Sequence, residues 1–168
     1  MNKLTFIIII FLLHSFPSFG DPNGNGIICK FKEGDKQSIN WNSYIEDGKP
    51  TEVGYLFRDD MVTFHYINRK NDDIKFRLNS NKKLRDPEDF RTTNEEIEWD
   101  TFSLHGESYY YVLNRKNLIL KKMTWSKNKT LVLRQCKVFP EKTYFEKMKK
   151  LSDVYQKNYN DKNKGNKI

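Results

Sequence analysis

A row of alternating carboxylates is the part of this chain whose spacing comes nearest to a catalytic arrangement. Glu96, Glu98 and Asp100 fall at every second position, so on a β-strand they share one face, about 7 Å apart in succession. That separation suits the carboxylate pair of an inverting glycosidase, which also requires one carboxyl group to be desolvated in a cleft. Because Ile97 and Trp99 occupy the other face, the row is more typical of a solvated sheet surface. We therefore expect no catalytic residue.

Four other residues are candidates for ligand binding. His105 and Glu107 flank a glycine in an expected loop, and loops often carry binding residues. Tyr110 stands on the outer face of its strand, where it could stack on a sugar or a base, although a plain cross-strand contact is the simpler interpretation. Arg115 lies in the turn that follows this strand. The other mature-chain histidine, His65, lies within an alternating strand and is more typical of a surface or cross-strand position.

The motifs of several chemistries are missing from the sequence. It contains no CxxC, no paired-histidine zinc motif, no serine nucleophile elbow and no glycine-rich phosphate loop. Asp21, Asn23 and Asn25 match the opening of a calcium-binding loop, but the twelfth position, which should be glutamate, is Lys32. We expect no metal, no cofactor and no specific nucleic-acid binding.

The first twenty residues have the pattern of a secretory signal peptide. Lys3 precedes an apolar run at positions 4–13, and Ser18 and Gly20 supply the small residues before a cleavage site. The run is shorter than the roughly 20 residues that span a bilayer. We expect cleavage, a mature chain starting at Asp21, no membrane span after cleavage, and a periplasmic or secreted location. A retained N-terminal anchor is the alternative.

Export bears on the two cysteines, Cys29 and Cys136. In an oxidising compartment an even pair that flanks a compact domain most often forms a disulfide. Such a bridge would close a loop of roughly a hundred residues and stabilise the fold by about 4–5 kcal/mol in the chain-entropy model. Two buried free thiols are the alternative.

Length and charge indicate one basic domain. The chain has 168 residues and a formal net charge of +8. The mature chain expected from Asp21 onward, about 148 residues, can bury one sizeable core. Lysine is enriched beyond position 140. A basic end can attract phosphates or anionic lipid, but a solvated Lys/Asn-rich end is the simpler interpretation.

Hydrophobic alternation with turns about every eight to twelve residues predicts an antiparallel sheet. The clearest stretch is the hairpin at 109–123, which turns at 114–117. The fold class expected is mainly β, an up-and-down meander that closes as a small barrel or twisted sheet, with a two-sheet sandwich as the alternative. The other predicted strands are 27–32, 52–57, 61–68, 74–78, 90–93, 95–101 and 130–139.

One amphipathic helix is predicted at 140–159, after the β domain. Thr143 and Glu146 form a possible capping box at its start, and we expect it to pack across the sheet or an open barrel end. Its apolar stripe consists of Tyr144, Met148, Leu151, Tyr155 and Tyr159. The domain organisation expected is a signal peptide at 1–20, a flexible lead-in at 21–26, the β domain at 27–139, this helix, and a disordered basic tail at 160–168.

Three stretches carry a resemblance to known proteins: Ile97-Glu98-Trp99, the hairpin at 111–120, and Gln135-Cys136-Lys137-Val138. With the lysine-rich helix behind them, they resemble a group of small exported proteins from AT-rich marine bacteria, over about 26–156. The resemblance implies export and a β fold, and it implies no chemistry.

The function expected from the sequence is a non-enzymatic periplasmic binding or interaction module, with an envelope protein or polymer as partner. Export, a disulfide-bonded β domain and the lack of a catalytic constellation motivate this expectation. One alternative is a barrel that carries a small apolar ligand. Another is a hydrolase acting on envelope polymers.

Overall fold

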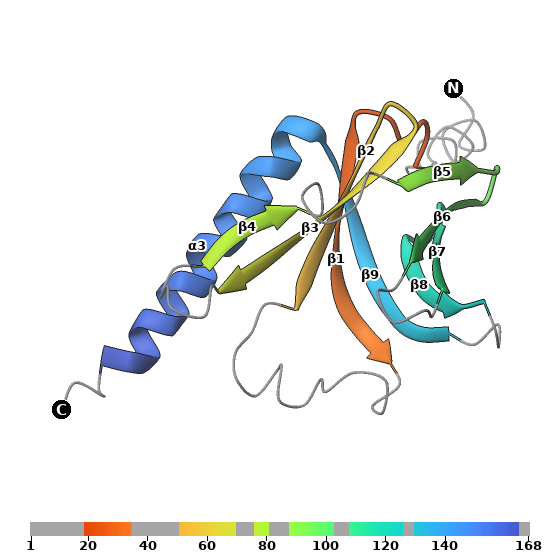
Figure 1. Ribbon diagram of the computed structural model, residues 1–168. Coiled ribbons are helices and arrows are strands. Elements are labelled where there is room, and N and C mark those ends of the chain that lie inside the picture. The colour runs from red at the N-terminus through yellow and green to blue at the C-terminus, as the bar shows by residue number, and fades with distance from the viewer. Residues whose placement is uncertain are drawn as a thin grey trace, which may run out of the picture.

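The fold is a closed, eight-stranded antiparallel meander barrel with one long C-terminal helix outside it (Figure 1). A computed structural model describes residues 19–34, 51–69, 76–80, 88–102, 108–125 and 130–164. The predicted class is confirmed, and the ends meet as a barrel rather than packing as a sandwich. The barrel strands are β1 (Asn25–Gly34), β2 (Glu52–Arg58), β3 (Met61–Arg69), β5 (Glu88–Thr92), β6 (Glu96–Phe102), β7 (Ser108–Asn114), β8 (Ile119–Thr124) and β9 (Thr130–Pro140).

Strand β3 belongs to two pairings along its length. Its first residues pair with β5, and its later residues pair with β4 (Phe76–Ser80), which leaves the barrel. β4 matches the later part of the strand predicted at 74–78; residues 74 and 75 lie outside the described residues. Since β2 also pairs with β3, the eight strands close into a ring, and β4 remains as the strand at the edge.

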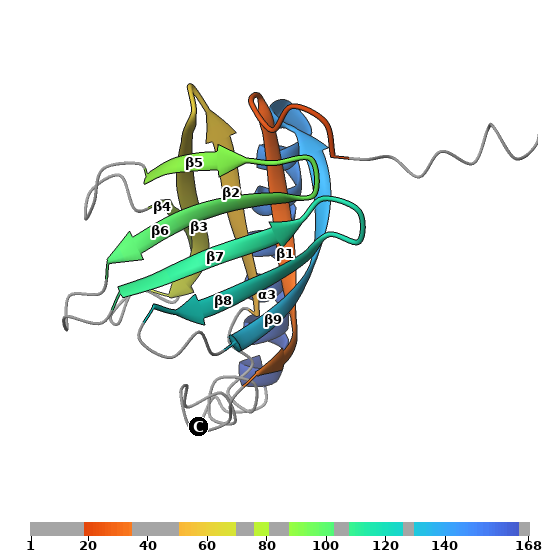
Figure 2. The ribbon, with the colours of Figure 1, turned by 90° about the vertical axis from the view of Figure 1, so that its right-hand side faces the viewer.

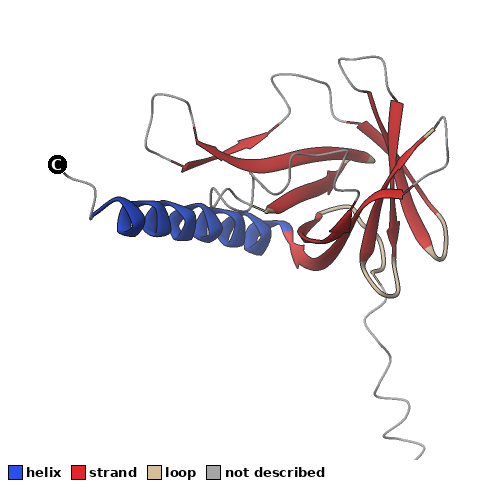
Figure 3. Cartoon of the chain, turned by 90° about the horizontal axis from the view of Figure 1, so that it is seen from below, coloured by secondary structure: helices blue, strands red, loops and turns tan. Residues whose placement is uncertain are grey.

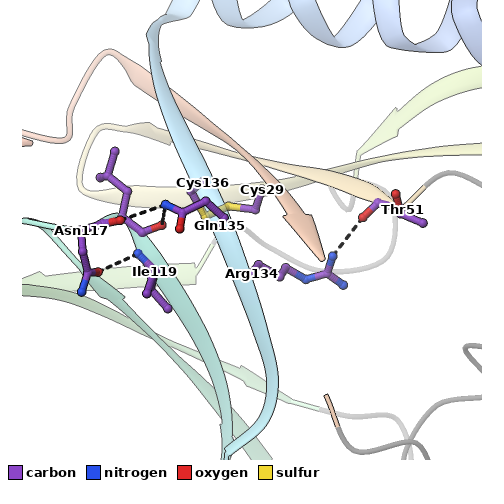
Figure 4. The surroundings of a disulfide bond; sticks show 8 residues. Cys29, Thr51, Asn117, Ile119, Arg134, Gln135 and Cys136 are labelled. Carbon is purple, nitrogen blue, oxygen red and sulfur yellow. Dashed lines mark hydrogen bonds between the residues drawn. A yellow bond between two sulfur atoms is a disulfide. The ribbon is translucent and has the colours of Figure 1, made fainter. Parts of the chain in front are cut away.

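The first and last barrel strands are joined covalently. β1 pairs with β9, and Cys29 stands directly opposite Cys136 in that register. The two form a disulfide with a Cα–Cα distance of 3.9 Å (Figure 4). This confirms the predicted bridge, whose sulfur atoms lie in the hydrophobic core.

Aromatic rings fill one end of the barrel. Tyr55 and Phe57 of β2 meet Trp99 of β6, with ring centroids 5.1 and 5.6 Å from the indole. Tyr111 of β7 stacks on the same indole at 5.3 Å. Phe19, ahead of the barrel, packs edge-on against Phe57 at 6.0 Å and is only 5% exposed. Along β6 the predicted alternation is the alternation between core and surface. In β2, by contrast, Gly54 to Phe57 are all buried, because the C-terminal helix covers the outer face of this strand.

The predicted hairpin is confirmed as β7, a tight turn and β8. The side-chain oxygen of Asn114 accepts hydrogen bonds from the backbone N–H groups of Lys116 and Asn117, each at 3.0 Å. Leu118 takes a positive φ of 55°, which completes the reversal. Asn117 then accepts from the N–H of Ile119 (Figure 4). Side chains, rather than glycine, therefore build this turn.

The helix α3 (Glu141–Asn163) covers the outer side of β1 and β9 and continues alongside β4 (Figures 1 and 3). Tyr144 and Met148 of the predicted stripe are fully buried against the barrel. The Tyr144 ring lies over two glycines: a Cβ on Gly26 would come within 2.3 Å of the ring, and a Cβ on Gly54 within 2.2 Å of the hydroxyl oxygen. Glycine at both positions is therefore required for the helix to approach the sheet.

The predicted capping box is wrong. The helix begins at Glu141, upstream of Thr143, and Pro140 at its N-cap makes no side-chain capping bond. Instead the N–H of Glu141 donates to the carbonyl of Gly24 at 3.0 Å. A tertiary contact with the lead-in thus satisfies one of the N–H donors that the first turn of a helix leaves without an intrahelical partner.

Candidate functional site

A surface groove of about 500 Å³ lies on the outer face of β5 to β8. Figure 2 shows these four strands on the side of the barrel away from α3. The groove is lined by Asp89, Arg91, Glu98, Trp99, Asp100, Tyr110 and Trp125.

The barrel core fixes which side chains face this groove. Phe90, Trp99 and Tyr111 pack into the core. Since side chains alternate along a strand, their neighbours in the sequence must point outward. Glu98 and Asp100 are accordingly exposed, as the alternation predicted.

Strand register arranges the charged groups in two rows. Arg91 of β5 stands opposite Glu98 of β6. Two residues further along β6, Asp100 stands opposite Tyr110 of β7. The register of β5 and β6 continued by one pair places Asp89 beside Asp100, and both line the groove. One row therefore has balanced charge, and the other has two carboxylates next to an aromatic ring.

Two aromatic rings form one wall of the groove. Tyr110 and Trp125 lie with ring centroids 4.8 Å apart and planes tilted by 43°. Trp125 is 59% exposed, whereas Trp99 is 3% exposed. An exposed indole beside a second ring offers an apolar surface on which another ring can stack, with a polar N–H at its edge.

These groups suit binding better than hydrolysis. Carboxylates accept hydrogen bonds from hydroxyl groups, a guanidinium donates to ring or carbonyl oxygens, and an indole stacks on an apolar face. A glycosidase acid must be desolvated to keep its proton, but Glu98 and Asp100 are both exposed. Their geometry offers hydrogen-bond acceptors and no protected proton donor.

Of the candidate binding residues from the sequence, Tyr110 and Arg115 are described, and they lie apart. Tyr110 lies in the groove. Arg115 lies five residues further along, at the other end of β7, roughly 17 Å away along an extended strand. His105 and Glu107 lie outside the described residues.

Arg115 fixes the segment that precedes the barrel. Its Nε donates to the carbonyl of Phe19 at 2.7 Å, and its Nη2 donates to the carbonyl of Gly20 at 2.9 Å. A further bond runs from Nη1 to the carbonyl of Thr93. The guanidinium thus holds Phe19 against the aromatic end of the barrel, a structural role.

Sequence reasoning missed three groove residues: Asp89, Arg91 and Trp125. Trp125 follows the end of β8. That it lies on the same face of the sheet as Tyr110 can be deduced only once the pairing of Tyr110 with Met123 is known. The other two sit on β5, which is short, and whose partner strands are set by closure of the barrel. The sequence feature that could have indicated the groove was Trp125, a single tryptophan next to polar residues.

The segment that matches the opening of a calcium-binding loop forms hydrogen bonds within the protein. Asn23 donates from Nδ2 to the carboxylate of Asp60 at 2.9 Å and accepts from the N–H of Asp60 at 3.1 Å. These bonds tie the lead-in to the turn between β2 and β3. Within the described ranges no three histidine, cysteine or acidic side chains gather in a group that could hold a metal ion.

No family model, curated protein or solved structure matches the chain. The fold and the groove define its class instead: a disulfide-linked meander barrel with an external helix and an aromatic, acidic groove on the opposite side. In the described part of the chain, no helix combines the length and apolarity needed to cross a membrane.

Proposed function

We propose that the protein is an exported, non-enzymatic binding module that holds a carbohydrate segment of an envelope polymer in the groove on β5 to β8. The observation that carries this proposal is the exposed Trp125 ring beside Tyr110, with Glu98 and Asp100 in the same groove. A sugar presents an apolar face and a rim of hydroxyl groups. The indole matches the face, and the carboxylates match the rim.

The groove is preferred over the barrel interior because large apolar and aromatic side chains of the described strands pack against one another there. The inner face also carries two basic side chains, since Lys122 pairs with Tyr111 and Arg134 pairs with Leu120. The Lys122 ammonium lies 3.9 Å from the Tyr109 ring centroid, and Arg134 donates to the carbonyl of Thr51. Charged groups on the inner face oppose the carriage of a wholly apolar ligand.

Titration calorimetry against a panel of neutral and amino-sugar oligosaccharides tests the proposal. We expect Trp125→Ala to weaken the tightest interaction about tenfold, equivalent to about 1.4 kcal/mol. Val154→Ala is the matched control, because Val154 is an exposed apolar residue on α3. The proposal fails if every oligosaccharide that binds does so equally well to the Trp125→Ala variant.

A second readout uses the indole itself. Trp125 is exposed and Trp99 is buried, so a ligand in the groove should change the emission of Trp125 first. We expect the ligand-induced emission change to disappear in Trp125→Phe, which keeps a ring for stacking. Turnover is tested on the same panel, and release of reducing ends would contradict a non-enzymatic role.

A further inference from the structure

The groove is acidic, although the protein as a whole is basic. Its lining contains three carboxylates and one guanidinium, an excess of two negative charges. The whole chain carries a formal net charge of +8. A surface patch with the average charge of this protein would be positive. The negative charge is therefore a property of the groove itself.

The excess charge is concentrated at the aromatic wall. Arg91 stands across from Glu98, which balances that row. Asp89 and Asp100 share the other row, and Asp100 pairs with Tyr110 across the β6–β7 ladder. Two carboxylates and the Tyr110–Trp125 ring pair therefore converge on the same part of the groove.

Carboxylates next to ring faces favour a positively charged group. An ammonium is attracted to the face of an indole or phenol ring by about 0.5–1 kcal/mol at exposed sites. The carboxylates of Asp89 and Asp100, which line the same groove, add to this attraction and repel an anion. A neutral sugar would use the rings and acceptors but would leave the two negative charges uncompensated.

From this arrangement we infer that the groove selects a cationic carbohydrate, an oligosaccharide of hexosamine units with free amino groups. The ammonium lies between Asp89, Asp100 and the two rings, and an adjacent sugar ring stacks on the exposed indole of Trp125. This inference rests on the proposed function, because it names the substrate class of the same groove. It adds that charge, as well as shape, determines the ligand.

A pair of oligosaccharides with one difference tests the inference. A glucosamine tetramer and an N-acetylglucosamine tetramer share their rings and linkages, and only the first carries free amines. We expect the glucosamine tetramer to bind at least tenfold more tightly in mildly acidic, low-salt buffer, where its amines are protonated and surface charges are little screened. The preference should shrink as the pH rises and the amines lose their protons.

Variants of the protein separate the roles of charge and stacking. Asp100→Asn should reduce the preference for the glucosamine tetramer at least threefold, while Trp125→Ala should weaken both tetramers. Asp153→Asn is the matched control, since Asp153 is an exposed carboxylate on α3 outside the groove. A tetralysine peptide, which keeps its charge across this pH range, is the probe for a basic peptide ligand.

The outcomes distinguish a failure of cationic selection from a failure of the proposed carbohydrate binding. Equal binding of the two tetramers, with loss of both in Trp125→Ala, overturns the cationic selection and leaves the carbohydrate site standing. Binding of neither tetramer, nor of any other oligosaccharide, overturns both. Tetralysine binding as tight as that of the glucosamine tetramer overturns the carbohydrate class.

Discussion

Removing the Phe19 ring is expected to destabilise the barrel substantially. This side chain is 5% exposed and packs edge-on against Phe57 at the aromatic end of the core. A buried Phe→Ala substitution typically costs about 3–5 kcal/mol. Phe19 is attached by a short segment at the end of the barrel, so we expect Phe19→Ala to cost about 3 kcal/mol.

Urea denaturation, followed by tryptophan emission, measures this loss. With a slope of about 1.5 kcal/mol per molar urea, the midpoint should fall by about 2 M. Gly20→Ala is the matched control, because a Cβ at Gly20 meets no atom within 4 Å and should leave the midpoint unchanged. Equal midpoints for Phe19→Ala and the unsubstituted chain would refute the assignment of Phe19 to the core.

The same measurement bears on processing. The sequence predicts cleavage after Gly20, and a chain that starts at Asp21 lacks Phe19 and two of the three carbonyls that accept from Arg115. Because Arg115 is partly exposed, water replaces most of those hydrogen bonds, and the lost ring dominates. The chain from Asp21 should therefore match Phe19→Ala in stability. The intact mass of the exported protein then decides which form exists.

Four further predictions concern the helix and the disulfide. Gly54→Ala should lower the free energy of unfolding by about 1–3 kcal/mol, since its Cβ would lie 2.2 Å from the Tyr144 hydroxyl oxygen; thermal melting checks this. The Tyr144 hydroxyl has no hydrogen-bond partner among the described residues, so Tyr144→Phe should keep or raise stability by about 1 kcal/mol. Burial raises the pKa of the Tyr144 phenol above the value of about 10 that tyrosine has in the unfolded chain. The free energy of unfolding should therefore be unaffected by this group below about pH 10 and should fall as the pH rises above it. Urea denaturation from about pH 8 to 11 should show a less steep fall in Tyr144→Phe than in the unsubstituted chain. Replacing both Cys29 and Cys136 by serine should cost about 4–5 kcal/mol by chain entropy, and an unchanged urea midpoint would contradict a stabilising bridge.

Most of the strands could be predicted because each carries its own evidence. The alternation of Ile97 and Trp99 with acidic residues requires only that one face of the strand be buried and the other exposed to solvent. The hairpin turn likewise depends on Asn114 and Asn117, whose side chains bond to nearby backbone. The start of the helix was predicted within one residue, but its cap was not, because the N–H of Glu141 donates to the distant carbonyl of Gly24.

The candidate site was predicted only in part. Tyr110 was identified because its face follows from the alternation. Arg115 was grouped with it on the basis of sequence proximity, yet the structure uses Arg115 to hold Phe19 at the other end of the strand. Five residues are a short stretch of sequence, but along an extended strand they separate two side chains by most of the length of the barrel.

The sequence by itself determined the class of fold, the pairing of the two cysteines and the outward position of Glu98 and Asp100, because these depend on local periodicity and on cysteine number. Only the tertiary structure decided which strands are neighbours, and therefore that Asp89, Tyr110 and Trp125 share one groove. It also decided that Gly26 and Gly54 face the Tyr144 ring. Closing the barrel sets the register of strands that lie far apart in the chain, and no local pattern encodes that register.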